Sequence, residues 1–148
     1  MSEFSITSPD FEEGGEIPKK FGYKHGNETP RIELHNVSEN VRTVALIMDD
    51  PDAMAAVGKV WVHWLVFTTS PHEGFPDNAD FRSFGMTDFG EIGYGGPAPP
   101  DGRHTYVFKL YDLDSDLDLE EGFTKADLED AMKGHILAEA KLTGTFAP

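Results

Sequence analysis

Short apolar runs and alternating apolar and polar residues dominate the chain. Residues 31–35 alternate as a half-buried strand does, and residues 43–48 form an apolar run that leads into Asp49-Asp50-Pro51-Asp52. Residues 60–67 are apolar on both faces, which is typical of a strand covered on two sides. Further strands are predicted around residues 4–6, at 104–111 and at 138–146. The pattern therefore predicts a mainly β domain.

One segment has clear helical spacing. Apolar residues recur at helical intervals between 128 and 132, after a Thr124–Asp127 pair that suits a capping box. Gly134 marks a break, so the spacing predicts a helix over about 125–137. Residues 70–103 are rich in glycine and proline, which predicts a long loop that is functional or carries short strands of its own. No linker is visible, and we expect residues 1–148 to form a single domain.

Composition excludes several classes of site and partner. The chain has no cysteine, so disulfides, thiolate metal sites and cysteine nucleophiles are excluded. Lysine and arginine number 12 against 27 aspartates and glutamates, a formal net charge of −15 that opposes binding to nucleic acid and anionic lipid. The carboxylates are scattered, which favours a surface adapted to high salt over a face for a basic partner. No targeting or membrane segment is visible, so we expect a cytoplasmic protein without membrane insertion.

Two familiar motifs are absent. The aspartates at 112, 114, 116 and 118 suggest a calcium loop, but Leu117 and Phe123 stand where an EF-hand beginning at Asp112 needs glycine and a carboxylate. A solvated strand edge or loop is the better interpretation. No Gly-x-Ser-x-Gly occurs, which argues against a serine hydrolase.

Four polar residues could meet at one end of the sheet. His63 shares a strand face with Trp61, His104 shares one with Tyr106, and Asp50 follows a buried strand. If these strands are neighbours, the side chains converge. The pattern alone leaves three interpretations open: satisfied core histidines, a ligand site, or a metal triad of two histidines and one aspartate.

A glycine- and proline-rich stretch, residues 93–97, is a second candidate. Its backbone N–H groups could approach a ligand closely, or the stretch could be a structural turn.

These residues resemble a known family. Residues 50–53, Gly58 and residues 61–64 are similar to the first motif of phosphatidylethanolamine-binding proteins. Residues 93–102, followed by 104–108, are similar to the second. Their order and spacing resemble the compact bacterial and archaeal branch, often described as Raf kinase inhibitor-like, and the resemblance covers nearly the whole chain.

The resemblance implies a large central antiparallel sheet, a second smaller sheet, and one or two short helices near the C-terminus. It also implies a pocket at one end of the sheet for a small anion such as phosphate or a phosphoethanolamine headgroup. We expect this pocket to hold no metal and no cofactor. By motif, the pocket residues are Asp50, Trp61, His63, Gly96, Pro97, His104 and Tyr106. Family members modulate kinases or proteases, so a protein partner of that kind is an expectation, and a homodimer is compatible with it.

Two positions depart from the family pattern. Met54 stands where the family usually has proline, and Thr105 replaces a frequent arginine. The first hypothesis is a non-enzymatic protein that binds a small anion or a phospholipid headgroup. The alternative is an enzyme that uses Asp50, His63 and His104 for acid–base or metal-assisted chemistry. A third interpretation is an interaction scaffold whose pocket is vestigial.

Overall fold

Two β-sheets of unequal size form the framework of the computed structural model, which describes residues 3–70, 74–75 and 82–148. The larger sheet has six strands in the order β2-β8-β7-β4-β5-β6, and β1 pairs with β3 in the smaller one. The strands are β1 (Ser5–Thr7), β2 (Gly15–Glu16), β3 (Glu33–His35), β4 (Thr43–Asp50), β5 (Trp61–Thr68), β6 (Arg82–Phe84), β7 (His104–Leu113) and β8 (Ile136–Phe146). All pairings between these strands are antiparallel except β2 with β8, which is parallel.

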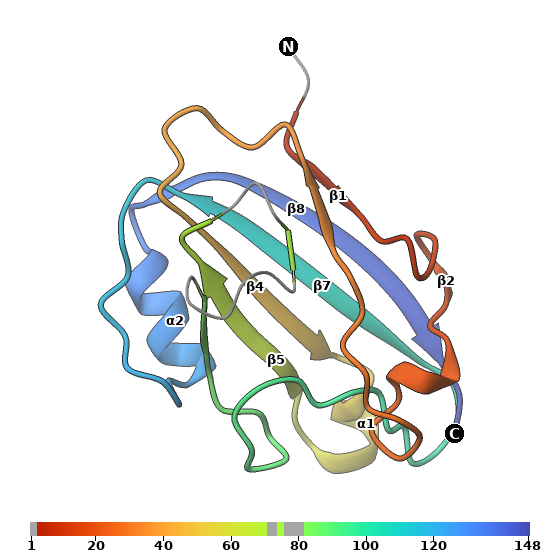
Figure 1. The fold of residues 1–148 in the computed structure, drawn as a ribbon. Helices are drawn as coiled ribbons and strands as arrows, with labels where there is room; N and C mark the ends of the chain where they lie inside the picture. Colours follow the sequence, from red (N-terminus) through yellow and green to blue (C-terminus); the bar gives the residue numbers. More distant parts are fainter. Residues whose placement is uncertain (1–2, 71–73, 76–81) are drawn as a thin grey trace.

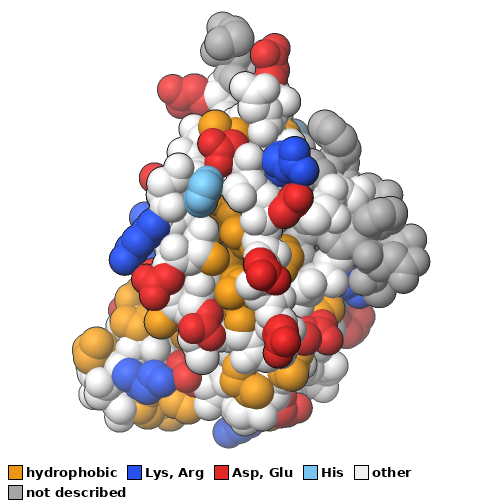
Figure 2. Space-filling view, turned by 90° about the vertical axis from the view of Figure 1, so that its left-hand side faces the viewer, with side chains coloured by type: hydrophobic (Ala, Val, Ile, Leu, Met, Phe, Trp, Pro, Cys, Tyr) orange, Lys and Arg blue, Asp and Glu red, His pale blue; other side chains and the backbone are white. Residues whose placement is uncertain are grey.

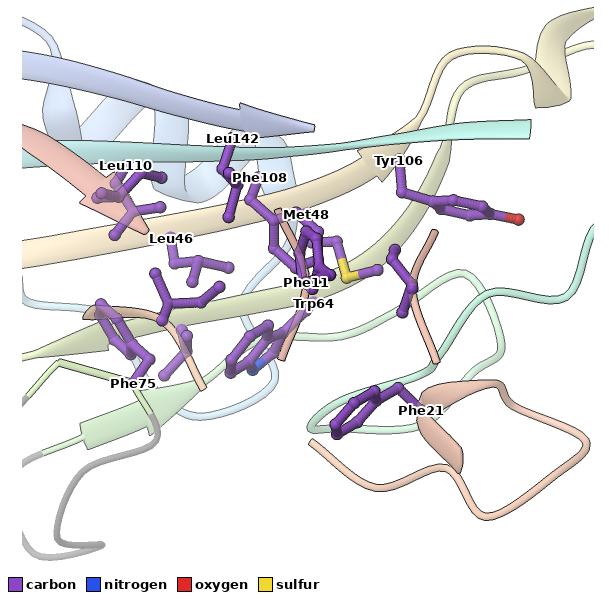
Figure 3. Close-up of a cluster of buried hydrophobic side chains, with 14 of the residues drawn as sticks. Phe11, Phe21, Leu46, Met48, Trp64, Phe75, Tyr106, Phe108, Leu110 and Leu142 are labelled. Carbon is purple, nitrogen blue, oxygen red and sulfur yellow. The ribbon is translucent and has the colours of Figure 1, made fainter. Parts of the chain in front are cut away.

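Each face of the large sheet carries its own hydrophobic cluster. The first face, which includes Leu46 and Met48, packs against β1 and the N-terminal segments (Figures 1 and 3). The second face, which includes Ala45 and Ile47, packs against α2 (Lys125–Met132). This double cover explains why β4 is buried along its whole length.

The expected fold class is confirmed, since the protein is mainly β with a large and a small sheet. Three details differ. The helix predicted over 125–137 ends at Met132, because Gly134 takes a left-handed conformation and β8 begins pairing with β7 at Ile136. A short helix, α1 (Ala53–Val57), and a single 3-10 turn, η1 (Lys19–Phe21), were not predicted.

The capping box at the start of α2 is confirmed. The Thr124 hydroxyl accepts a hydrogen bond from the Asp127 N–H, and the Asp127 carboxylate accepts one from the Thr124 N–H. The interpretation of the aspartate series as a solvated edge or loop is wrong for Asp112. That carboxylate is fully buried on β7 and accepts a 2.8 Å hydrogen bond from the Ser38 N–H, and burial raises its pKa.

Acidic side chains are spread over the face drawn in Figure 2, with few basic ones between them. Hydrophobic side chains show in a hollow near the middle of this face and at its lower end. Within the described residues, none of the helices has the length and apolar character needed to cross a bilayer.

Candidate functional site

Three neighbouring strands bring the predicted polar residues to one end of the large sheet. β4 ends at Asp50, and the antiparallel strands β5 and β7 begin beside it at Trp61 and His104. Aromatic rings then line this end of the first face. The ring centroids of His104 and Tyr106 are 6.4 Å apart, those of Tyr106 and His63 5.1 Å, and those of His63 and Phe89 5.4 Å. The convergence expected from the strand pattern is therefore present.

A β-bulge in β5 sets the direction of the His63 side chain. Met48 of β4 lies opposite Trp64, and the next residue, Asp49, lies opposite Val62. His63 is therefore the extra residue of the bulge and has no residue opposite it on β4. Trp64 packs in the first-face cluster and Val62 in the second. His63 contacts Tyr106 on the first face, so two consecutive residues, His63 and Trp64, lie on the same side of the sheet.

A cavity of about 210 Å³ opens at this end of the sheet. Three of the predicted residues, Asp50, Trp61 and His63, line it, together with α1 and the segment between β6 and β7. His104 and Tyr106, which were also predicted to line the pocket, are not among its lining residues. The lining residues are Asp50, Ala53, Ala56, Val57, Trp61, His63, Phe89, Ala98 and Pro100. Most of the wall is apolar, and its two ionisable groups are the Asp50 carboxylate and the His63 imidazole.

His63 is a buried, neutral imidazole. Its Nδ1 lies 2.8 Å from the carbonyl oxygen of Gly95, an acceptor, so Nδ1 carries the proton and Nε2 carries a lone pair. Burial lowers the pKa of His63, and the backbone carbonyl and the Asp50 charge only partly oppose this. Near neutral pH this ring therefore accepts a hydrogen bond at Nε2 instead of offering a positive charge.

His104 is the opposite case. Its Nδ1 lies 2.6 Å from Oδ2 of Asp50, and its Nε2 lies 2.6 Å from Oδ1 of Asp101. Burial alone disfavours the charged ring, but the two carboxylates outweigh it and raise the pKa of His104. The ring is thus held as an imidazolium that donates on both sides.

Two buried oxygen atoms at this end lack hydrogen-bond partners among the described residues: Oδ1 of Asp50 and the hydroxyl oxygen of Tyr106. Asp50 is 3% exposed and Tyr106 is fully buried. Burial raises the pKa of Tyr106 and the Asp50 charge adds to the effect, while the nearby Ala98 backbone partly opposes them, so the hydroxyl keeps its proton. Figure 3 shows this hydroxyl pointing away from the packed aliphatic side chains. Buried polar atoms are normally paired, so both are candidates to meet a ligand.

The glycine- and proline-rich stretch is used for packing within the protein. The N–H of Gly95 donates to the carbonyl of His63, and the N–H of Gly96 donates to the Asn27 side chain. A Cβ atom on Gly96 would lie 1.9 Å from the carbonyl oxygen of Phe21. These N–H groups are therefore already satisfied, unlike the expectation that they are free to face a ligand. Gly96 and Pro97 support the site from behind and do not line the cavity.

Residue 54 lies on α1 at the cavity rim. The N–H of Met54 donates to the carbonyl of Pro51 at 3.2 Å, and its carbonyl accepts from Gly58 at 3.0 Å. Proline at this position would lose only the first of these two bonds, and the first turn of a helix tolerates proline. Met54 and Val57 are about half exposed.

Sequence reasoning missed Phe89, the α1 residues and Asp101. Phe89 stands in a loop without periodicity, and contacts between its ring and those of Tyr23, Trp61 and His63 hold it beside the cavity. Asp101 lies within the second motif, but no spacing argument indicates that its carboxylate reaches His104.

A metal triad is not formed by these residues in the described part of the chain. No group of three histidine, aspartate or glutamate side chains there is arranged to hold an ion. Both nitrogens of His104 already face carboxylates, so neither offers a lone pair.

Comparisons with known proteins indicate one family. The family profile described as phosphatidylethanolamine-binding protein matches residues 7–147. A UPF0098 protein from Methanothermobacter thermautotrophicus is 42% identical over 144 residues, which is 92% of this chain and 93% of the relative. One from Chlamydia muridarum is 41% identical over 145 residues, with 95% and 97% covered.

Solved structures show the same fold. A homologue of phosphatidylethanolamine-binding proteins from Chlamydia trachomatis superposes with a TM-score of 0.88 at 37% identity, over 98% of this chain and 97% of the homologue. Escherichia coli YbcL, described as a member of the mammalian family, superposes with a TM-score of 0.82 at 24% identity, over 98% of each chain.

Proposed function

Since this chain belongs to the phosphatidylethanolamine-binding protein family, we propose that its cavity binds a small phosphate-bearing headgroup. Phosphoethanolamine, which carries an ammonium group and a phosphate, is the representative ligand, and inorganic phosphate is its simplest part. The observation that carries this proposal concerns Asp50, which lines an otherwise mostly apolar cavity and whose buried Oδ1 has no hydrogen-bond partner in the part of the chain that the structure describes.

The Asp50 oxygen suits the ammonium end. A buried carboxylate oxygen without a partner gains most from a charged donor. The rings of Trp61 and Phe89 lie in the same wall, with centroids 5.6 Å apart, and aromatic faces attract cations. The Asp50 carboxylate and the two aromatic rings therefore favour an ammonium group over an anion at this part of the cavity wall.

Donors for the phosphate end lie beside Asp50. They are the Tyr106 hydroxyl and the imidazolium of His104, whose two N–H groups face Asp50 and Asp101 in the free protein. His63 adds an acceptor at Nε2 that suits the P–OH of a singly protonated phosphate ester.

Cavity size limits the ligand. Pockets for drug-sized molecules usually span about 300–1,000 Å³, and this cavity has about 210 Å³. A headgroup therefore fits and a whole phospholipid does not.

Calorimetric titration tests the proposal with three ligands: phosphoethanolamine, inorganic phosphate and ethanolamine. We expect phosphoethanolamine to bind most tightly, because only it satisfies both ends. Asp50→Asn should remove its advantage over inorganic phosphate. Absence of binding for all three ligands would contradict the proposal.

A second candidate function is acid–base chemistry on a bound ligand. Asp101, His104 and Asp50 form a continuous chain of two 2.6 Å hydrogen bonds from a half-exposed carboxylate to the cavity wall. Such a chain can move a proton between solvent and a bound group.

Phosphorus NMR separates the two candidates. Phosphoethanolamine or a phosphate monoester recovered unchanged after long incubation supports binding alone. Release of inorganic phosphate that is lost in His104→Gln supports an enzyme, as would a stoichiometric transition metal in the purified protein.

A further inference from the structure

Asp101 occupies the outward nitrogen of a buried imidazolium. His104 is 4% exposed, and its two ring nitrogens each lie 2.6 Å from a carboxylate. The inner carboxylate, Asp50, has a side chain that is 4% exposed, whereas the Asp101 side chain is 53% exposed. The two partners of this ring therefore differ sharply in their access to water.

This difference in exposure determines which of the two carboxylates can move away from the His104 ring. Removing Asp50 from the ring would strand a buried charge, which is costly. Asp101 can turn into solvent and recover its hydration. The residue after it, Gly102, has a φ of +139°, a conformation that glycine adopts easily and other residues rarely do. Gly102 therefore permits the local backbone conformation in which the Asp101 carboxylate reaches His104.

Asp101 also changes what an approaching anion meets. The imidazolium supplies one positive charge, and Asp50 and Asp101 supply two negative ones, so the cluster is net negative while all three are together. Asp101 directly follows Pro100, which lines the cavity. Asp50, on the other side of the His104 ring, also lines the cavity, so the N–H that Asp101 holds lies one imidazole ring away from the cavity wall.

We propose that Asp101 is an internal competitor for the phosphate: its carboxylate caps His104 in the free protein and is exchanged for a phosphate oxygen when the ligand binds. This inference rests on the proposed function. It makes Asp101 a specificity-determining residue, because a ligand must be a better partner for the imidazolium than a tethered carboxylate. Phosphate dianions satisfy this condition, and simple carboxylates such as acetate do not.

The test compares Asp101→Ala and Asp101→Asn with Asp116→Ala in calorimetric titrations with inorganic phosphate. Asp116 is an exposed aspartate paired with Arg42, and it lies near the other end of β7 from His104. Its removal changes the net charge equally and controls for long-range repulsion. We expect Asp101→Ala to bind phosphate about tenfold more tightly than the wild type and Asp116→Ala to bind with nearly unchanged affinity.

Several outcomes overturn the inference. If the wild type binds phosphate and both Asp101 variants bind equally or more weakly, Asp101 positions His104 instead of competing, and the proposed function survives. An equal gain in Asp116→Ala would also refute it, since net charge would then explain the effect. Absence of binding in the wild type and in every variant contradicts the proposed function itself. Acetate gaining affinity in Asp101→Ala would support the competition.

Discussion

Asp49 and Asp50 are consecutive in β4, and their buried carboxylates lie on opposite faces of one sheet. Oδ2 of Asp49 accepts hydrogen bonds from Lys109 at 3.1 Å and from Lys125 at 2.9 Å. Because Lys125 opens α2, Asp49 ties that helix to the second face. Asp50 instead meets His104 on the first face, and its side chain is part of the cavity lining. Two adjacent residues of one type thus have separate tasks.

Isosteric replacement should separate these tasks. Asp49→Asn leaves two lysines without their shared charge, so we expect it to lower the free energy of unfolding by about 1–3 kcal/mol with phosphate affinity unchanged. Asp50→Asn should weaken phosphoethanolamine binding strongly. Urea denaturation and calorimetry on both variants check this, and a loss of ligand affinity in Asp49→Asn would contradict the division.

His63→Ala should abolish phosphate binding and reduce the free energy of unfolding by about 1–3 kcal/mol. The imidazole lines the cavity, and its removal leaves the Gly95 carbonyl without a partner. His135→Ala is the matched control, because His135 is half exposed, pairs with Asp114, and lies by the far end of β7. Calorimetric titration with phosphate decides the matter: wild-type binding by His63→Ala would mean that the cavity is not the site.

The two site histidines should titrate on opposite sides of the ordinary histidine pKa of 6.5. Burial lowers the pKa of His63, so its contribution to stability is present above pH 6.5 and is lost as the pH falls through its folded value. Asp50 and Asp101 raise the pKa of His104 against the effect of burial, so its contribution is present below pH 6.5 and is lost as the pH rises through its folded value.

Proton NMR of the imidazole Hε1 signals gives both values directly. In urea denaturation, His104→Gln should flatten the decline of stability above pH 6.5. A titration of His104 below 6.5 would show that the carboxylates do not hold it charged.

Salt should stabilise the fold. With a formal net charge of −15, self-repulsion weakens the folded state at low ionic strength, and about 0.1 M salt screens it beyond roughly 10 Å. We expect the melting temperature to rise as KCl increases from millimolar to molar, measured without phosphate so that ligand binding adds nothing. A flat or falling curve would refute adaptation to high salt and leave a basic partner as the reason for the acidity.

The long strands could be predicted because their residues carry the signal themselves. β4 and β5 are apolar runs because both of their faces are covered. β7 and β8 alternate because one of their faces is more exposed than the other. α1 could not be predicted: it has five residues, and its N-cap, Asp52, makes no side-chain capping bond. The position of α1 is fixed by the chain reversal between β4 and β5.

Some residues of the candidate site could likewise be predicted from the sequence, and others could not. The period of two places His63 with Trp61 and His104 with Tyr106, and their meeting follows from strand neighbourhood. A strict period of two would place Trp64 on the opposite face from His63. Because of the bulge, both side chains lie on the first face. Phe89 and Asp101 depend on loop conformations that no local pattern encodes. Whether the assembled residues bind a ligand remains a prediction.

The parallel pairing of β2 with β8 has a consequence for how the chain folds while it is being synthesised. Gly15 lies beside Gly144 in the sheet, and the Glu13 carboxylate accepts a hydrogen bond from the N–H of Thr143, 130 residues away. A ribosome adds residues in order, at about 5–20 per second. The nascent β2 segment therefore waits several seconds for its partner, and the edge of β7 stays unpaired for roughly 1–7 seconds between the synthesis of Leu113 and that of β8. β8 covers this edge of β7 and then pairs with β2. A chaperone that shields β7 until β8 has been made would protect the chain while this strand edge is exposed.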